Sequence, residues 1–94
     1  MTKDERSRDI GRIVADVWAE LFDARAVNAD DDFFALGGDS LLAAQATSRI
    51  SSQIERSVSP RFLFQHSTPR SLALAIDEQH EFVAVLSADN AWSF

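Results

Sequence analysis

The chain has 94 residues and a formal net charge of −6, from 9 Lys and Arg against 15 Asp and Glu. This length makes one small domain with a modest hydrophobic core. An acidic chain of this size is a poor nucleic-acid binder, because phosphate binding needs clustered Lys and Arg. The absence of cysteine excludes disulfides and zinc-thiolate sites, and it is compatible with a reducing cytoplasm.

The chain shows neither a membrane-spanning segment nor a secretory signal. No apolar run reaches the length that crosses a bilayer, and the charged residues 1–6 do not resemble a signal peptide. We therefore expect a cytoplasmic protein, most simply a monomer, that binds neither membranes nor nucleic acid.

The first expected element is a helix over residues 4–22. Thr2 and Glu5 have the spacing of a capping box, in which each residue satisfies a free backbone N–H of the other. Apolar residues recur on one face of this segment at helical spacing. They are Ile10, Ile13, Val14, Val17, Trp18 and Leu21.

A long connection over residues 23–38 follows. The run Asp30 to Asp32 lacks the alternating ligands and terminal Glu of a calcium-binding loop, so a solvated acidic turn is expected. A loop this long in so small a domain is usually functional or held down by its own apolar residues. The candidates for that anchoring are Val27, Phe33, Phe34 and Leu36.

The second expected helix covers residues 40–55, with Asp39 or Ser40 as its N-cap. Its pattern predicts one face directed at the core and another left on the surface. The core face comprises Leu42, Ala43, Ala46, Thr47 and Ile50, with Ile54 near the end. The surface face comprises Leu41, Ala44 and Ser48.

Each proline of the chain marks a helix start. Ser59-Pro60 and Thr68-Pro69 both place an N-cap residue before a proline at the first helical position. The third helix is expected to be short, over residues 60–66, with Phe62, Leu63 and Phe64 available to the core. The fourth begins at Pro69, and its apolar side comprises Leu72, Ala73 and Ile76.

These elements predict an all-α fold. No segment has a sustained two-residue alternation that would support a sheet. We expect a four-helix bundle with a long loop between helices one and two and a short third helix.

The C-terminal residues give the weakest pattern. Val83 and Leu86 could continue the apolar stripe of the fourth helix, which Asp89-Asn90 would then end. We expect residues 1–80 to form the domain and residues 81–94 to be an extension or linker. The alternative is a docking peptide that inserts Trp92 and Phe94 into a partner.

The strongest functional pattern is residues 31–42, Asp-Asp-Phe-Phe-Ala-Leu-Gly-Gly-Asp-Ser-Leu-Leu. Gly37 and Gly38 permit a sharp turn, and Ser40 follows where a helix begins. A serine there is exposed, and the helix dipole with its free N–H groups favours an anion at that end. The pattern suits attachment of a phosphate group to Ser40.

This run resembles the phosphopantetheine attachment motif of acyl and peptidyl carrier proteins, and it is most similar to the thiolation domains of nonribosomal peptide synthetases. The resemblance extends from about Ile10 to Ile76. It implies that Ser40 bears a 4′-phosphopantetheine arm, with Gly37, Gly38 and Asp39 around the attachment point. The arm would hold aminoacyl or acyl groups as thioesters, and the carrier itself would not be an enzyme.

The resemblance also implies partners. A phosphopantetheinyl transferase would attach the arm, and an adenylation enzyme would load it. Condensation or epimerisation domains, a thioesterase or tailoring enzymes would then use the cargo. The expected docking residues are Leu41, Ala44, Ser48 and Phe34.

The charge of the second helix helps to separate the types of carrier. Its charges are Arg49, Glu55 and Arg56, whereas fatty-acid carriers typically have an acidic helix there. This favours a peptidyl carrier, with a polyketide-type acyl carrier as the alternative. Ser67 departs from the resemblance, because many relatives have proline at that position.

Two other classes of function compete with a carrier. Gly38-Asp39-Ser40-Leu41 also matches the nucleophile motif of GDSL esterases, and Asp77 and His80 have the spacing of that family's other catalytic residues. That family resembles an α/β domain about twice as long, so we expect Asp77 and His80 to match by chance on the exposed side of the fourth helix. A purely structural interaction module is the other class.

A metal site is not expected. The two histidines, His66 and His80, lie far apart in the sequence and form no ligand pattern. His66 is expected at the end of the third helix.

Overall fold

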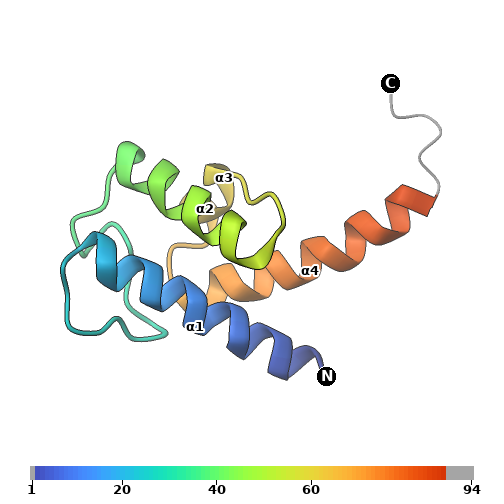
Figure 1. Cartoon of the computed structure of the whole chain (residues 1–94), viewed down its shortest axis with the longest axis horizontal. Helices are drawn as coiled ribbons and strands as arrows, with labels where there is room; N and C mark the ends of the chain where they lie inside the picture. The colour runs from blue at the N-terminus through green and yellow to red at the C-terminus, as the bar shows by residue number, and fades with distance from the viewer. Residues whose placement is uncertain (1, 89–94) are drawn as a thin grey trace.

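The computed structural model describes residues 2–88, with side chains described for residue 2 and residues 5–78. In this part of the chain α1 spans Lys3–Leu21, α2 Ser40–Ile54, α3 Pro60–Gln65 and α4 Pro69–Ala88. Helix α1 packs against α2 and α4, and the short α3 closes the space between α2 and α4 (Figure 1). The expected four-helix fold, with its long first loop and short third helix, is confirmed.

The helices begin where the local sequence provides caps. Thr2 and Glu5 form the reciprocal capping box at the start of α1. Ser59 and Thr68 each accept a hydrogen bond from a backbone N–H in the first turn of α3 and α4. These side chains satisfy amide groups that a helix leaves unpaired at its N-terminus, which is why each start could be predicted.

The core is formed by the predicted apolar faces. Helices α1, α2 and α3 and the long loop each contribute a large, fully buried side chain to one cluster. These side chains are Trp18, Ile50, Leu63 and Phe33, respectively. The other buried residues of the cluster are Val14, Val17, Val27, Ala43, Ala46, Val58, Leu72 and Ile76. The small residues on α2 allow this helix to lie close to α1.

Two apolar residues expected in the interior lie on the surface. Phe64 of α3 is 51% exposed, and Leu36 of the long loop is 38% exposed. A helix of six residues has room to direct only one large side chain fully inward, and in α3 that residue is Leu63. Phe64 instead stacks against Phe34 of the loop, with ring centroids 5.4 Å apart.

Helix α4 continues past the expected domain boundary near residue 80 and ends at Ala88. Its C-terminal half extends beyond the other helices (Figure 1). No helix in the described part of the chain is both long and apolar enough to cross a membrane. The boundary at residue 80 stays a prediction, and Trp92 and Phe94 lie outside the described residues.

Candidate functional site

Ser40 is the first residue of α2, and it is exposed. Asp39 is the N-cap, and its carboxylate accepts a hydrogen bond of 2.9 Å from the Leu42 N–H. The Asp39 carbonyl accepts the first helical bond, 2.8 Å from the Ala43 N–H. The N–H groups of Ser40 and Leu41 therefore remain at the helix end, where they favour a negatively charged group.

The turn before Ser40 needs both glycines, for different reasons. Gly37 has φ of +109°, a backbone conformation that side-chain-bearing residues rarely adopt, and the space around it is open. Gly38 has no room for a side chain, because an added Cβ would lie 2.3 Å from the Phe33 ring. The two glycines thus bring Ser40 out of the loop at the surface, directly beside a fully buried ring.

Phe33 anchors this turn in the core. Its ring makes edge contacts with Trp18 and Phe22 of α1, at centroid distances of 4.9 and 5.1 Å. Its carbonyl accepts a 3.0 Å hydrogen bond from the Gly38 N–H. The buried ring of Phe33 and the backbone hydrogen bond from Gly38 therefore fix the position of the chain just before Ser40.

Asp32 holds the other side of the same turn. Its carboxylate accepts hydrogen bonds from the N–H groups of Phe34 and Ala35, at 3.0 and 2.9 Å, and from the Ser67 hydroxyl. The Ser67 hydrogen bond, followed by that of Ala35, holds the pKa of Asp32 below its usual value. The Phe33 N–H also donates to the Ser67 carbonyl, at 2.7 Å.

Ser67 is thus a positioning residue that sequence reasoning missed. It was noted only as a departure from proline, yet it binds the loop before Ser40 to the connection between α3 and α4. A proline could not provide the hydroxyl. No sequence signal pairs Ser67 with Asp32, since the two residues are 35 positions apart.

The acidic turn expected over Asp30 to Asp32 is tied down at each carboxylate. Asp30 forms a two-pronged ion pair with Arg70 of α4, at 2.9 and 3.2 Å, and Asp31 accepts a 2.9 Å bond from the Asn28 N–H. The Arg70 hydrogen bond and charge lower the pKa of Asp30. Among the side chains that the structure describes, residue 2 and residues 5–78, no group of three or more carboxylate or imidazole side chains is placed to hold a metal ion.

Exposed apolar side chains flank Ser40. Leu41 is 67% exposed, and the other two predicted α2 docking residues, Ala44 and Ser48, also lie on the surface. Phe34 is half-buried and stacks on Phe64 of α3. We call Leu41, Ala44, Ser48, Phe34 and Phe64 the α2–α3 face; its aromatic part includes Phe64, which the sequence pattern had assigned to the core.

The residues of the esterase alternative do not fit an active site. Asp77 was expected on the exposed side of α4, but it is 1% exposed and accepts a 3.0 Å ion pair from Arg6 of α1. It therefore serves the contact between α1 and α4, and the expected exposure of Asp77 is wrong. The side chain of His80 lies outside the described residues, and the helical fold is not the α/β domain that this chemistry uses.

Comparison with known proteins agrees with this geometry. A family model described as "Phosphopantetheine attachment site" matches residues 12–76. Phosphinothricin tripeptide synthetase of Streptomyces viridochromogenes is 43% identical over 65 residues, which are 69% of this chain and 6% of that protein. The chain thus spans only a small part of this relative's length.

Two solved structures share the fold. BlmI, a type-II acyl carrier protein of Streptomyces verticillus involved in bleomycin biosynthesis, superposes with a TM-score of 0.73 and 30% identity, covering 85% of this chain and 93% of BlmI. A nonribosomal PCP domain superposes with a TM-score of 0.62 and 33% identity, covering 78% and 86%. The chain belongs to the phosphopantetheine-attachment family, as a carrier protein domain of nonribosomal peptide synthetases.

Proposed function

We propose that Ser40 is the residue that carries 4′-phosphopantetheine. The observation that carries this proposal is its position as an exposed hydroxyl on the first residue of α2, within the matched family segment. When bound, the group supplies a thiol that holds aminoacyl or acyl cargo as a thioester. Since the chain has no cysteine, no thiol of its own competes for that cargo.

The residues around Ser40 suit the attachment of a phosphodiester. The uncapped amides at the start of α2 stabilise the added negative charge, and the open space at Gly37 lets an enzyme surface approach. The Asp39 carboxylate accepts the hydrogen bond of the Leu42 N–H, so we assign to Asp39 the role of capping α2.

Attachment would need a separate phosphopantetheinyl transferase, with magnesium and coenzyme A, because we assign no base of this chain to activate the Ser40 hydroxyl. The Ser40 oxygen forms a bond to the phosphorus next to pantetheine, the bond to the departing adenosine phosphate breaks, and the hydroxyl proton goes to a base of the transferase. In this step the chain is a substrate, and we propose no catalytic role for it.

The partner enzymes would bind the α2–α3 face. An adenylation enzyme would load the arm, and condensation, epimerisation, thioesterase or tailoring enzymes would then take the cargo. Tethering makes each delivery effectively intramolecular. Leu41 is the expected centre of contact, because among the described side chains it is the most exposed large apolar one, and it directly follows Ser40.

A charge placed on the docking face tests this arrangement. Leu41→Asp should lower kcat/KM for aminoacylation of the phosphopantetheine-bearing carrier by about tenfold, since it puts a carboxylate into an apolar contact. The matched control is Gln53→Asp, which adds the same charge to an exposed position of α2 about 20 Å along the helix. Equal rates for wild type and Leu41→Asp, measured with a cognate adenylation enzyme, would refute the docking face.

A further inference from the structure

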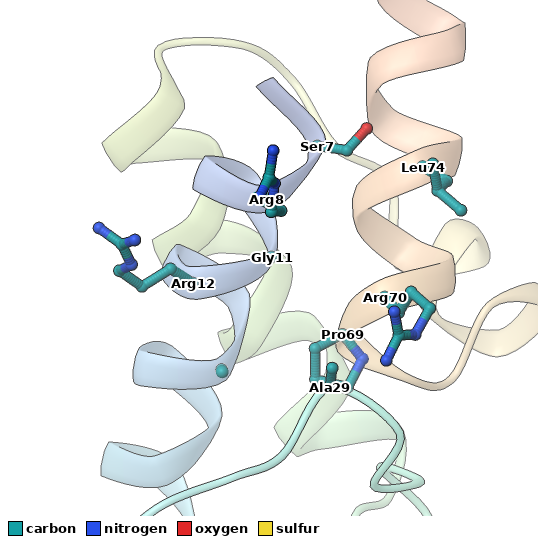
Figure 2. Close-up of a pocket in the computed structure, with 9 residues that line it drawn as sticks. Ser7, Arg8, Gly11, Arg12, Ala29, Pro69, Arg70 and Leu74 are labelled. Atoms are coloured by element: carbon teal, nitrogen blue, oxygen red, sulfur yellow. The ribbon is translucent and has the colours of Figure 1, made fainter. Parts of the chain in front are cut away.

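In the described part of the chain, the long loop is hydrogen-bonded at two places to the residues around the start of α4. The first lies at a groove of about 680 Å³ between α1 and α4, whose lining includes Ala29 and Arg70 (Figure 2). There the Ala29 carbonyl accepts a 3.0 Å bond from the Arg70 N–H. The second place is the pair Asp32 and Ser67. Only this second place includes the turn that leads to Ser40, so it is the one that adjoins the α2–α3 face.

The two carboxylate oxygens of Asp32 have different partners. Oδ2 accepts the N–H groups of Phe34 and Ala35, both within the loop, at 3.0 and 2.9 Å. Oδ1 accepts the hydroxyl of Ser67, which precedes α4. The Ser67 carbonyl adds a 2.7 Å bond from the Phe33 N–H. One charged group thus joins the loop backbone to the connection between α3 and α4, and we call Asp32 and Ser67 the loop clasp.

The loop clasp lies close in sequence to both aromatic residues of the α2–α3 face. Phe34 follows Asp32 by two residues, and Phe64 precedes Ser67 by three. The two rings stack with centroids 5.4 Å apart and planes inclined by 12°. The loop clasp therefore sets the separation of the two backbone segments that bear these rings.

The rings of Phe33, Phe34 and Phe64 form a row from the core to the surface. Phe33 is fully buried, and the half-buried Phe34 meets its edge at a centroid distance of 5.3 Å. Phe64 is the outermost ring and is 51% exposed. Exposed rings contribute strongly to protein binding, because they bury a large apolar area and have few side-chain torsions to fix. Phe64 thus offers its open side to a partner while Phe34 supports the other.

We propose that Asp32 and Ser67 are positioning residues for partner enzymes, because the loop clasp holds Phe34 against Phe64 in the arrangement that an apolar partner surface binds. This rests on the proposed function of the α2–α3 face. Without the Ser67 hydroxyl, Oδ1 of Asp32 loses its bond and the loop bearing Phe34 gains freedom. Partners would then bind only the stacked fraction of molecules, which weakens the apparent affinity. Neither clasp residue is hydrogen-bonded to Ser40, so KM should rise while kcat stays unchanged.

The test measures aminoacylation of the full, phosphopantetheine-bearing chain by a cognate adenylation enzyme, with the carrier as the varied substrate. Ser67→Ala should raise KM roughly fivefold without changing kcat. Ser67→Thr keeps a hydroxyl for Asp32 and should restore the wild-type KM. The matched control is Ser71→Ala, which removes another half-buried serine hydroxyl, one whose hydrogen bonds are to Thr68 in the first turn of α4. Its KM should equal that of the wild type.

A double-mutant cycle shows whether the loop clasp acts through the exposed ring. Phe64→Ala alone should raise KM roughly tenfold, and adding Ser67→Ala should then have little further effect. Unchanged KM in either single variant, a fall in kcat with KM unchanged, or fully additive effects in the double variant would overturn the proposal. An equal rise in Ser71→Ala would overturn it too, since any lost hydroxyl would then suffice.

A measurement on the unloaded chain separates this proposal from that for Ser40. Nuclear Overhauser effects between the ring protons of Phe34 and Phe64 should be present in the wild type and in Ser67→Thr. In Ser67→Ala they should weaken, and the N–H groups of Phe34 and Ala35 should exchange faster with solvent. Unchanged ring contacts and exchange rates in Ser67→Ala would refute the loop clasp even if Ser40 is modified. A wild type that stays unmodified would instead refute the assignment of Ser40 and leave this result standing.

Discussion

Gly38 shows how tightly the chain before Ser40 is built. Its Cα faces the fully buried Phe33 ring at a distance that leaves no room for a methyl group. The ring is enclosed by Trp18 and Phe22 and has little freedom to move aside. The position of Ser40 is therefore coupled to the hydrophobic core through one glycine and one ring.

We predict that Gly38→Ala destabilises the fold by about 1–3 kcal/mol, the range for overpacking a filled core. Urea denaturation followed by circular dichroism measures this change. A variant as stable as the wild type would show that the Phe33 ring can move, and it would remove the proposed coupling.

Asp32 makes stability depend on pH. Its pKa is lowered in the folded chain, so its contribution is present above the ordinary value of 3.8 and is lost as pH falls through that value to the lowered one. We expect Asp32→Asn to be less stable than wild type at neutral pH, with the difference shrinking below about pH 4. Urea denaturation across this range measures it.

The neighbouring Asp31→Asn serves as the control, because it removes the same charge but leaves the three hydrogen bonds of Asp32, including that from Ser67, in place. If the difference in stability between Asp32→Asn and the wild type were the same at every pH, the three hydrogen bonds of Asp32 would not hold the loop as described.

At the residue scale, the sequence pattern located an exposed serine at the start of α2 but not the residues that support it. The turn at Gly37 and the helix start at Ser40 could be predicted because both depend on local backbone geometry. The packing of Gly38 against the Phe33 ring could not, because it depends on the core. Ser67 could not, because its role depends on meeting Asp32 across the fold. Phe64 was expected in the core because it is apolar. A helix as short as α3 has too few turns for the spacing of its residues to show which of them face inward.

At the scale of elements, α1 carries a glycine in its middle. Glycine in a helix interior costs about 0.5–1 kcal/mol relative to alanine, because it loses more backbone freedom on folding. The Cβ that alanine adds would make ordinary contacts with Ala73 and Pro69. Gly11 thus differs from Gly38, where the same added atom overlaps a ring.

We therefore predict that Gly11→Ala raises the free energy of unfolding by about 0.5–1 kcal/mol. Thermal and urea denaturation would show it as a higher midpoint, in the opposite direction to Gly38→Ala. A lower midpoint would mean that α1 and α4 pack more closely at this point than the structure indicates.

Helix positions were well predicted because their signals are local. Capping residues precede α1, α2, α3 and α4, and the apolar spacing identified the buried faces. The burial of Asp77 was not predicted, since helical spacing alone does not show that Arg6 of α1 lies opposite it. Nor does a sequence pattern disclose a groove, which forms only when α1 and α4 come together.

At the scale of the whole molecule, two different surfaces lie apart from each other. The α2–α3 face is largely apolar and adjoins Ser40, whereas Arg8, Arg12 and Arg70 are among the residues that line a groove between α1 and α4. The long loop joins them, because Asp32 supports the turn before Ser40 while Asp30 contacts Arg70 at the groove.

The central claim is that Ser40 bears the phosphopantetheine arm, and intact-protein mass spectrometry tests it most directly. Wild type and Ser40→Ala are incubated with coenzyme A, magnesium and a broad-specificity phosphopantetheinyl transferase, after circular dichroism shows that both are folded. The account predicts one added phosphopantetheine on the wild type and none on Ser40→Ala. Addition to Ser40→Ala, or none to the folded wild type, would contradict it.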